Sequence, residues 1–260
     1  SSIFRENIVA KIISITGSCG KTTLKEMIGL ALKDMFKTTY SPKSFNNKYG
    51  VPLSLFNLKQ DDDFGVFEVG MDKKGEIDYL TNIIKPDLGI ITNISYAHAK
   101  NFENIRKIAD AKAEIIDNIK SDGALILNND DYFYNYHKNL AFKKKLKVIS
   151  FGIDSKSSMV KLMKIKRLKN KFNLSINING SIVSFYSHND NKSHLYNILA
   201  TLASIDCFTD IKNLRKNIFL NFKNPNGRGN IIKIKYKNKN FFLIDETYNS
   251  NPLSLKTAIE

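Results

Sequence analysis

The chain has 260 residues, of which 42% are hydrophobic, and its formal net charge at pH 7 is +15. Its two cysteines, Cys19 and Cys207, have no paired spacing, so neither a disulfide framework nor a cysteine zinc site is expected. No apolar run approaches the roughly 20 residues of a membrane-spanning helix, and no signal peptide is visible. These features predict a cytoplasmic protein without membrane insertion.

The positive charge is compatible with a nucleic-acid partner, but its distribution argues against one. Lysines are scattered along the chain among many asparagines and isoleucines. The densest stretches, "FKKKLK" and "KLMKIKRLKNK", alternate with apolar residues, which is typical of solvated strand faces. No nucleic-acid partner is therefore expected, whereas acidic substrates fit the charge.

Strand-like and helix-like segments alternate in the first part of the chain, which is expected to enter its first strand almost directly from Ser1. The predicted strands are 11–16, 64–70, 87–94, 124–129 and 146–151, and the predicted helices are 21–35, 49–57, 75–84, 103–119 and 131–139. Apolar strands separated by helices are typical of parallel sheets. The pattern predicts an α/β fold, a mostly parallel sheet with helices on both faces.

The pattern changes at residues 158–187, where apolar residues alternate with a period near two around an Asn-Gly pair. This predicts antiparallel hairpins, a small antiparallel excursion of about residues 157–190. Helices are expected at 194–206 and 210–221, then a hairpin in "NIIKIKYKNKNFFLIDE" that turns near residues 237–239. A last helix is expected in "NPLSLKTAIE".

A glycine-rich turn in "ISITGSCGKTTLKEM" joins the first predicted strand to the first predicted helix. Phosphate-binding loops place backbone N–H groups around phosphates, a lysine on the β- and γ-phosphates and a hydroxyl on Mg²⁺. Gly17, Gly20, Lys21 and Thr22 fit these tasks. The usual pattern has four residues between its two glycines, which would put the first glycine at position 15. That position holds Ile15, so the pattern in this chain is the shorter Gly-x-x-Gly-Lys-Thr. A plain strand-to-helix turn is the alternative, but the two glycines and their flanks favour a P-loop type of fold.

Polar residues also follow other predicted strands, where ligands of open parallel sheets bind. Glu68 interrupts "FGVFEVGM", and a carboxylate within a sheet strand is costly unless it is paired or binds a cation. It is a candidate Mg²⁺ ligand, directly or through water. The alternative is a strand that ends early and leaves Glu68 exposed. His98 and Asp245 each follow a strand in the same way, although a single histidine is more often a surface residue.

Lys112 stands out in the helix predicted around "ENIRKIADAKAEIIDNI". The apolar stripe of this helix consists of Ile105, Ile108, Ile115 and Ile119, and its spacing puts position 112 on the same face. A buried ammonium is costly, and burial lowers its pKa. The alternative is a side chain that buries its stem and extends its amine to water. The periodicity leaves both open.

Taken together, the motifs of this chain resemble the Mur ligase family. In family order they are "ITGSCGKTTLKEM", "SFNNKYGVPLSLFNL", "FEVGMDKKGEIDYLTNIIKPDLGIITNI", "AHAKNF", "IADAKAEI", "LNNDD", "GRG" and "DETYNSNP". They extend over nearly the whole chain. The Asn-Asn-x-x-Gly-Val-Pro-Leu and Gly-Glu-Ile-x-Tyr-Leu segments favour the member that adds D-alanyl-D-alanine to the UDP-muramoyl-tripeptide.

The resemblance implies a set of site residues. The family uses the shortened glycine pattern as its ATP loop, which here comprises Gly17, Ser18, Cys19, Gly20, Lys21, Thr22 and Thr23. Lys21 would neutralise the β- and γ-phosphates. Thr22 and Glu68 would hold one Mg²⁺, and His98 would help to hold a second. Lys112 matches the family's carbamylated lysine, whose anion can face a metal-lined cleft.

Further residues match family contacts to the nucleotide and the substrate. Asn197 matches an adenine contact, Arg228 a γ-phosphate contact and Asp245 a ribose contact. Asn46 and Asn47 match the segment near the acyl substrate. The chain departs from the family at three positions: Ser193 and His194 replace a His-Asn pair before Asn197, and Tyr96 replaces a proline. The catalytic set implied is Lys21, His98, Lys112 and Arg228.

The resemblance implies an ATP-dependent amide ligase of peptidoglycan synthesis. Its substrates would be UDP-N-acetylmuramoyl-tripeptide and D-alanyl-D-alanine, joined through an acyl phosphate by a monomeric enzyme. Residues 1–260 would form the central ATP-binding domain, without the family's N-terminal UDP-substrate domain and C-terminal Rossmann-like domain. Such a chain alone is expected to be inactive.

Three other interpretations compete with this one. The first is another ligase of the same fold, acting on folate or a different muramoyl peptide, and the Asn-Asn-x-x-Gly-Val-Pro-Leu segment argues against it. The second is a basic P-loop ATPase associated with nucleic acid, which would need basic and aromatic residues clustered on one face. The third is a fragment that binds a nucleotide without turnover.

Overall fold

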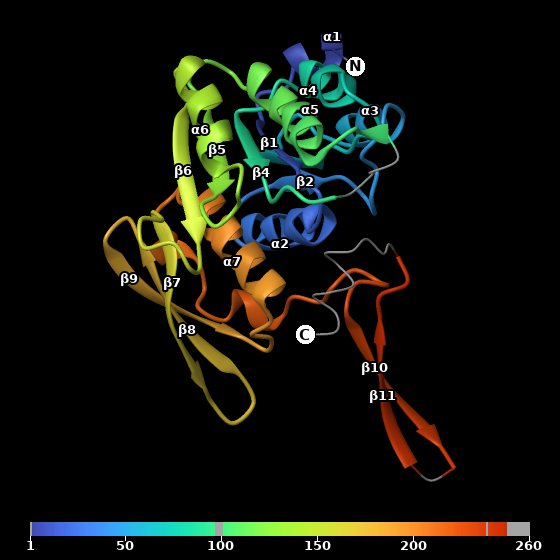
Figure 1. Ribbon diagram of the computed structural model, residues 1–260, viewed down its shortest axis with the longest axis vertical. Helices are drawn as coiled ribbons and strands as arrows, with labels where there is room; N and C mark the ends of the chain where they lie inside the picture. Colours follow the sequence, from blue (N-terminus) through green and yellow to red (C-terminus); the bar gives the residue numbers. More distant parts are fainter. Residues whose placement is uncertain (1, 97–100, 238, 249–260) are drawn as a thin grey trace.

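The computed structural model describes residues 2–96, 101–237 and 239–248 (Figure 1). The strands are β1 (Lys11–Thr16), β2 (Thr38–Tyr40), β3 (Phe64–Glu68), β4 (Leu88–Ile91), β5 (Ala124–Asn128), β6 (Lys147–Gly152), β7 (Val160–Arg167), β8 (Phe172–Ile178), β9 (Ser181–Ser187), β10 (Asn230–Tyr236) and β11 (Lys239–Asp245). The helices are α1 (Ser2–Glu6), α2 (Lys21–Lys33), α3 (Gly50–Leu55), α4 (Glu76–Ile84), α5 (Ile105–Asp117), α6 (Tyr134–Lys143) and α7 (Lys192–Ile205).

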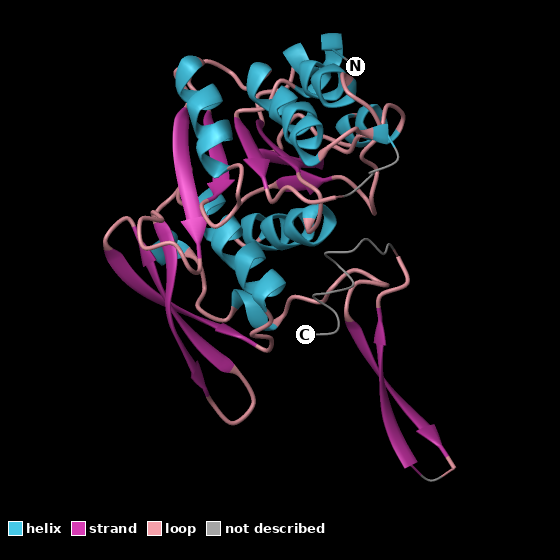
Figure 2. Cartoon of the chain, viewed as in Figure 1, coloured by secondary structure: helices cyan, strands magenta, loops and turns pink. Residues whose placement is uncertain are grey.

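A nine-stranded sheet in the order β2-β3-β1-β4-β5-β6-β7-β8-β9 forms the centre of the molecule (Figure 2). Its neighbours from β2 to β7 pair in parallel. Helices α2 and α7 pack on one face, and α3, α4, α5 and α6 pack on the other. Two hydrophobic cores therefore lie on opposite sides of the sheet, and β1 is buried on both faces because it runs between them. The predicted α/β class, with helices on both faces, is confirmed.

The predicted antiparallel segment is confirmed as β7, β8 and β9, which pair antiparallel and extend the large sheet at one edge. Burial alternates along β8, as expected for a strand with one face on the core. The second predicted hairpin is β10–β11, a two-stranded sheet that extends away from the body (Figure 1). It carries large exposed apolar side chains, including Ile231, Phe242 and Ile244.

Two expectations about the elements were wrong, and one strand was missed. The chain does not enter β1 directly, because the short helix α1 precedes it and buries Arg5 against the carbonyl of Ile84. Strand β2 was missed because three residues are too few to show an alternating pattern. The helix expected at 210–221 is two 3₁₀ turns, η2 (Ile211–Asn213) and η3 (Ile218–Leu220).

The error at 210–221 has a physical reason. The buried residues Ile211, Leu214, Ile218 and Phe219 have helical spacing, which suggested one continuous helix. The carboxylate of Asp210 accepts a hydrogen bond from Lys212 N at 2.9 Å and closes a short turn instead. The helix expected in the last ten residues lies outside the described residues.

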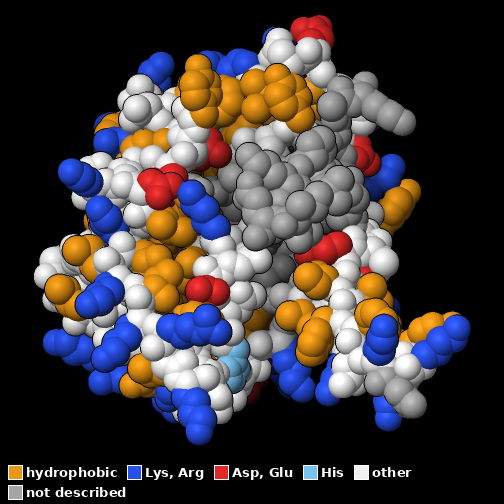
Figure 3. Space-filling view, turned by 60° about the horizontal axis from the view of Figure 1, so that its bottom comes forward, with side chains coloured by type: hydrophobic (Ala, Val, Ile, Leu, Met, Phe, Trp, Pro, Cys, Tyr) orange, Lys and Arg blue, Asp and Glu red, His pale blue; other side chains and the backbone are white. Residues whose placement is uncertain are grey.

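The charge is dispersed over the face of the molecule that Figure 3 shows. Lysine and arginine side chains are spread over the face shown in Figure 3, between hydrophobic and acidic ones. Within residues 2–96, 101–237 and 239–248, no helix is both long enough and apolar enough to span a bilayer.

His137 of α6 is a buried titratable group at the interface with α5. It is 2% exposed, and its Nε2 lies 3.1 Å from the carbonyl oxygen of Ala109, which can only accept, so Nε2 carries the proton. Burial lowers the pKa of His137 from 6.5 to about 4. The imidazole is therefore neutral in the folded protein at neutral pH.

We predict that His137 makes the protein less stable at mildly acidic pH. Because its pKa is lower in the folded than in the unfolded chain, the unfolded chain binds more protons between pH 4 and 6.5. The free energy of unfolding should thus fall by about 2 kcal/mol between pH 7 and pH 5 through this group. His137→Gln, which keeps a donor, should remove that part of the decrease in urea titrations. The exposed variant His188→Gln is the control, and equal pH dependence in both variants would contradict the prediction.

Candidate functional site

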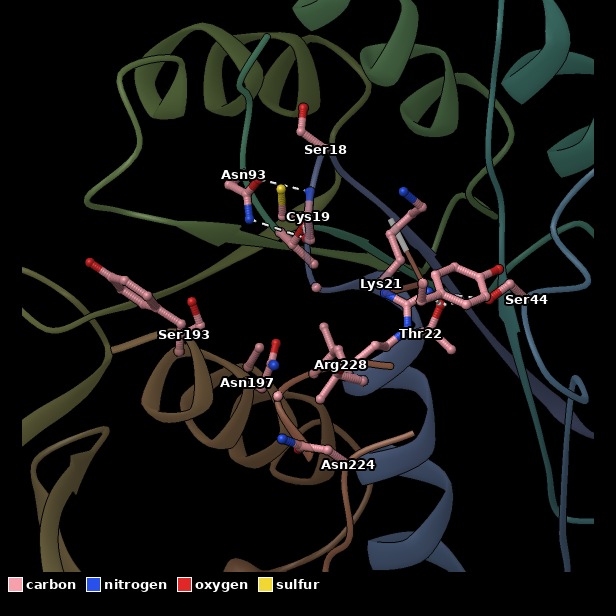
Figure 4. Close-up of a pocket in the computed structure, with 18 of the residues that line it drawn as sticks. Ser18, Cys19, Lys21, Thr22, Ser44, Asn93, Ser193, Asn197, Asn224 and Arg228 are labelled. Carbon is pink, nitrogen blue, oxygen red and sulfur yellow. Dashed lines mark hydrogen bonds between the residues drawn. The ribbon is translucent and has the colours of Figure 1, made fainter. Parts of the chain in front are cut away.

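The carboxyl ends of β1, β3, β4 and β5 open into one cleft of about 2000 Å³. Parallel strands end at the same edge of a sheet, so loops far apart in the sequence meet there. The cleft is lined by residues 18–24, 44, 46–49, 70–76, 92–93, the start of α7 and residues 227–231, among others. Figure 4 shows that Lys21, Thr22, Ser44 and Arg228 lie together in this cleft, while Ser193 and Asn197 come from α7.

The phosphate loop, residues 17–23, needs its first glycine for two reasons. Gly17 has a φ of 143°, a conformation that L side chains rarely adopt, and a Cβ there would lie 1.9 Å from Thr92 Oγ1. Thr92 Oγ1 donates a hydrogen bond to the carbonyl of Cys19 at 2.6 Å. Asn93 Oδ1 accepts one from Cys19 N at 3.0 Å. The end of β4 therefore holds the loop in shape, as the dashed lines at Asn93 show (Figure 4).

The polar end of the cleft brings together side chains far apart in the sequence. Lys21 Nζ donates to the carbonyl of Gly17 at 2.9 Å. Thr22 Oγ1 lies 3.1 Å from Ser44 Oγ and accepts a hydrogen bond from Arg228 Nη2 at 2.9 Å. The guanidinium of Arg228 also stacks on Tyr248, 4.0 Å from the ring centroid. The structure thus brings Arg228 to the phosphate loop, and the γ-phosphate contact that the resemblance implied stays a prediction.

Glu68 is completely buried at the end of β3. Its Oε1 accepts a hydrogen bond from Asn46 Nδ2 at 2.9 Å, and its Oε2 has no hydrogen-bond partner within the described part of the chain. The alternative of an exposed Glu68 was therefore wrong. An unpaired buried carboxylate oxygen is costly, so Glu68 fits a cation.

The residues of the cleft also fit the coordination habits of magnesium. The described ranges hold no group of three His, Cys, Asp or Glu side chains that would form an all-protein metal site. Magnesium is usually bound through one or two carboxylates together with substrate phosphates and water. Glu68 and the hydroxyl of Thr22 could supply such a partial set of ligands. Whether they do so stays a prediction.

Lys112 lies on the buried face of α5, as its periodicity suggested, and is only 2% exposed. The alternative of an amine that extends to water was therefore wrong. Burial holds the pKa of Lys112 well below its usual range, and the neighbouring charge of Lys21 lowers it further. No hydrogen bond or ion pair joins Lys112 to another described residue. Its amine is thus favoured in the neutral, nucleophilic form.

Positive charge prevails around the phosphate loop. Burial lowers the pKa of Lys21, and the nearby carboxylate of Glu68 raises it in part while Arg228 lowers it. Two cationic side chains, Lys21 and Arg228, therefore face one carboxylate. Such an excess of partly buried positive charge is suited to a polyanion, and the backbone N–H groups at the start of α2 add to it.

The other end of the cleft is formed by α7. Asn197 is 8% exposed and packs next to the phosphate loop. A Cβ added at Gly20 would lie only 3.3 Å from its Oδ1. Ser193 and His194, where the chain departs from the family pattern, also line the cleft. His194 Nε2 lies 3.1 Å from Ser187 Oγ, and burial lowers the pKa of His194 to about 4.

Some predicted site residues lie elsewhere or have another structural task. Asp245 does not line the cleft, whereas Ile244 and Glu246 do, and its Oδ1 accepts a hydrogen bond from Thr247 Oγ1 at 2.7 Å. Asn47 lines the cleft, and its Oδ1 accepts a hydrogen bond from Gly50 N at 2.9 Å at the start of α3. His98 lies outside the described residues. Ser44, Thr92 and Asn93 were not predicted as site residues; the last two form the polar end of "GIITNI", which is the one local signal for them in the sequence.

Comparisons with known proteins agree with this arrangement. The Mur ligase middle domain family matches residues 15–205. A UDP-N-acetylmuramoyl-tripeptide–D-alanyl-D-alanine ligase of Rickettsia prowazekii is 34% identical over 259 residues, which cover 98% of this chain and 56% of the relative. A crystal structure of MurF from Acinetobacter baumannii is similar with a TM-score of 0.88 and 28% identity, covering 98% of this chain and 55% of that chain.

A second solved structure shares the fold. It is a MurF ligase from Thermotoga maritima in complex with ADP, with a TM-score of 0.86 and 24% identity, and the match covers 99% of this chain and 58% of that chain. The chain thus spans about half the length of the curated relatives that it matches along nearly its whole length.

We predict that Gly17→Ala disrupts the phosphate loop far more than a matched glycine substitution does. Both the positive φ and the contact with Thr92 oppose an alanine at position 17, so the cost should be about 3 kcal/mol or more. Gly75 also has a positive φ, 90°, but a Cβ there meets nothing within 4 Å. Gly75→Ala should therefore cost only about 1 to 2 kcal/mol. Urea unfolding measures both, and equal costs would show that the contact with Thr92 relaxes easily.

Proposed function

Because the chain belongs to the Mur ligase family, we propose that it is the ATP-binding part of a ligase that joins D-alanyl-D-alanine to UDP-N-acetylmuramoyl-tripeptide in peptidoglycan synthesis. One observation carries this proposal: Lys21, Thr22 and Arg228 line one cleft at the phosphate loop, and the half-satisfied carboxylate of Glu68 lies behind the cleft residue Asn46. The relatives' names support the choice of substrates.

The proposed reaction proceeds through an acyl phosphate. The terminal carboxylate of the tripeptide attacks the γ-phosphorus of ATP, which yields the acyl phosphate and ADP. The amine of D-alanyl-D-alanine then attacks the acyl carbon, and phosphate leaves with the electron pair of the broken C–O bond. A carboxylate is a poor electrophile, and its phosphorylation supplies the leaving group.

The residues of this chain would mainly position the substrates and neutralise charge. Lys21 and Arg228 would bind the phosphate oxygens, which offset the excess of positive charge at the loop. Thr22 and Glu68 would hold magnesium, which supplies further charge neutralisation to the phosphates. Asn197 and the start of α7 would receive the adenine, and Asn46 and Asn47 would lie near the acyl substrate. Asp245 does not line the cleft, so the ribose contact that the resemblance implied for it is not part of this assignment.

We further propose that Lys112 is carbamylated in the working enzyme. The neutral amine would attack the carbon of CO₂, release one proton and form an N–C bond that ends in an anionic carbamate. The lowered pKa of Lys112 and its burial support this step, because the reaction requires the unprotonated amine. The nearby Lys21 would offset the new negative charge, and the anion could hold a second magnesium together with His98.

Two further domains would complete the substrate sites of the proposed enzyme. We propose residues 1–260 as the central ATP-binding domain, with a UDP-substrate domain and a Rossmann-like domain outside this chain. The relatives' greater length supports this division, and so do the exposed apolar side chains of β10–β11, which a further domain could bury. The enzyme is proposed to act as a cytoplasmic monomer.

We predict that Lys21→Ala weakens the binding of Mg-ATP at least about tenfold, because a charge-assisted contact to phosphate is lost. Calorimetric titration with Mg-ATP measures the affinity. Lys33→Ala removes an exposed lysine from the other end of α2 and should bind as the wild type does. Equal affinities of the wild type and Lys21→Ala would refute the assignment of the phosphate loop.

We predict that Lys112→Ala and Lys112→Arg both lose about 10²-fold in activity, because neither side chain can form a carbamate. Phosphate release by the full-length protein, with ATP, UDP-N-acetylmuramoyl-tripeptide and D-alanyl-D-alanine, measures it. Acetate should partly restore Lys112→Ala by taking the place of the anion, but should not restore Lys112→Arg.

The same assay has two controls. Lys107→Ala changes an exposed lysine of α5 and should stay active. Full activity of both Lys112 variants would disprove the carbamate. A wild-type protein that releases no phosphate with the complete set of substrates would disprove the proposed function itself.

A further inference from the structure

Lys25 of α2 is a fully buried lysine that the phosphate, metal and substrate assignments do not use. Its side chain is 0% exposed, in the second turn of the helix that begins with Lys21 and Thr22. A buried ammonium is costly unless it is paired and hydrogen-bonded. The question is therefore what this charge holds.

The partners of Lys25 are two backbone carbonyls and one carboxylate. Nζ donates hydrogen bonds to the carbonyl oxygens of Ser41 and Lys43, the latter at 2.5 Å. It also forms an ion pair with Glu26 Oε1 at 2.9 Å. Both carbonyls belong to residues 41–47, which we call the bridging loop. The ammonium thus ties the bridging loop to α2.

The bridging loop needs such a tie, because its backbone is strained. Lys43 has a φ of 47°, in the left-handed region that residues other than glycine rarely adopt. A conformation of this kind costs about 1 to 3 kcal/mol and persists only where surrounding contacts hold it. The hydrogen bond from Lys25 Nζ to the Lys43 carbonyl is such a contact.

The bridging loop contacts two groups that are proposed to hold magnesium. Ser44 Oγ lies 3.1 Å from Thr22 Oγ1, and Asn46 Nδ2 donates to Glu68 Oε1 at 2.9 Å. The carbonyl of Asn46 accepts a hydrogen bond from Gly70 N at 2.8 Å, which joins the loop to the end of β3. One segment therefore orients both the hydroxyl of Thr22 and the carboxylate of Glu68.

We propose that Lys25 is a positioning residue: its ammonium holds the bridging loop on α2, so that Ser44 and Asn46 orient Thr22 and Glu68 toward magnesium. This inference rests on the proposed function, since it assumes that Mg-ATP binds in the cleft. Loss of the ammonium removes none of the groups that would contact magnesium or phosphate. It lets the bridging loop move away from α2, and both groups then lose their orientation.

The test compares two lysines of the same helix. Lys25→Met keeps the length of the side chain but removes the charge and the donors. Lys33→Met is the matched control. Both lysines lie over the Tyr40 ring, Lys25 Nζ at 5.9 Å and Lys33 Nζ at 4.5 Å from its centroid, but Lys33 is exposed and does not hold the bridging loop. Calorimetry measures the affinity for ATP over a series of Mg²⁺ concentrations, and thermal unfolding shows whether each variant is folded.

Lys25→Met should need about tenfold more Mg²⁺ for half-maximal ATP binding, the usual scale for the loss of a group that orients a metal ligand. Lys33→Met should match the wild type, and Lys25→Arg, which keeps the charge and the donors, should recover part of the loss. In full-length protein, kcat should fall along with the shifted Mg²⁺ dependence. An unchanged Mg²⁺ dependence in folded Lys25→Met would overturn the proposal, even if kcat fell. A smaller fraction of folded protein lowers kcat but does not change the Mg²⁺ concentration for half-maximal ATP binding.

A second variant keeps the test decisive if Lys25→Met does not fold. Ser44→Ala removes the contact to Thr22 and leaves Lys25 in place, and it should also raise the Mg²⁺ requirement. A wild-type Mg²⁺ requirement in Ser44→Ala would overturn the proposal. Wild-type protein that binds Mg-ATP but forms no product would instead contradict the proposed ligase activity, and leaves the binding test of Lys25 intact.

Discussion

The parallel pairing of β1 with β3 and β4 is the constraint on which the rest of the site depends. Ile15 is paired with Glu68 and Thr16 with Ile91, so the strands end together at one edge of the sheet. This register places the phosphate loop, the carboxylate of β3 and the polar end of β4 side by side. A one-residue slip would turn Glu68 to the opposite face, away from α2.

Three buried charged or titratable side chains surround this edge, and they differ in how completely the protein satisfies them. Lys25 has two carbonyls and Glu26 as partners. Glu68 has a partner for one oxygen, and Lys112 has none among the described residues. Because unsatisfied polar groups are costly away from water, the missing partner of Glu68 Oε2 is consistent with the proposed cation. By this measure Lys25 is structural support, whereas Glu68 keeps one oxygen without a partner among the described residues, as the proposed magnesium site requires.

The elements that could be predicted from the sequence are those with a strong local signal. Strand β1 agrees with its predicted bounds because a strand buried on both faces is a continuous apolar run. Strand β2 and α1 were missed because each is shorter than the window over which periodicity can be seen. The region 210–221 has helical spacing without a helix, since short polar caps and packing on the core decided its backbone.

Within the site, the sequence predicted the phosphate loop from its glycines, Lys112 from its place on an apolar stripe and Glu68 from its place in an apolar strand. It did not determine Ser44, Thr92 and Asn93, which are single polar residues in loops with no periodic signal. Three features are visible only in the folded chain: Arg228 reaches Thr22, Glu68 is buried rather than exposed, and Lys25 holds the bridging loop. These contacts join segments far apart in the chain. The pairing of parallel strands brings such segments together, and no local sequence pattern in any one segment shows that it will meet the others.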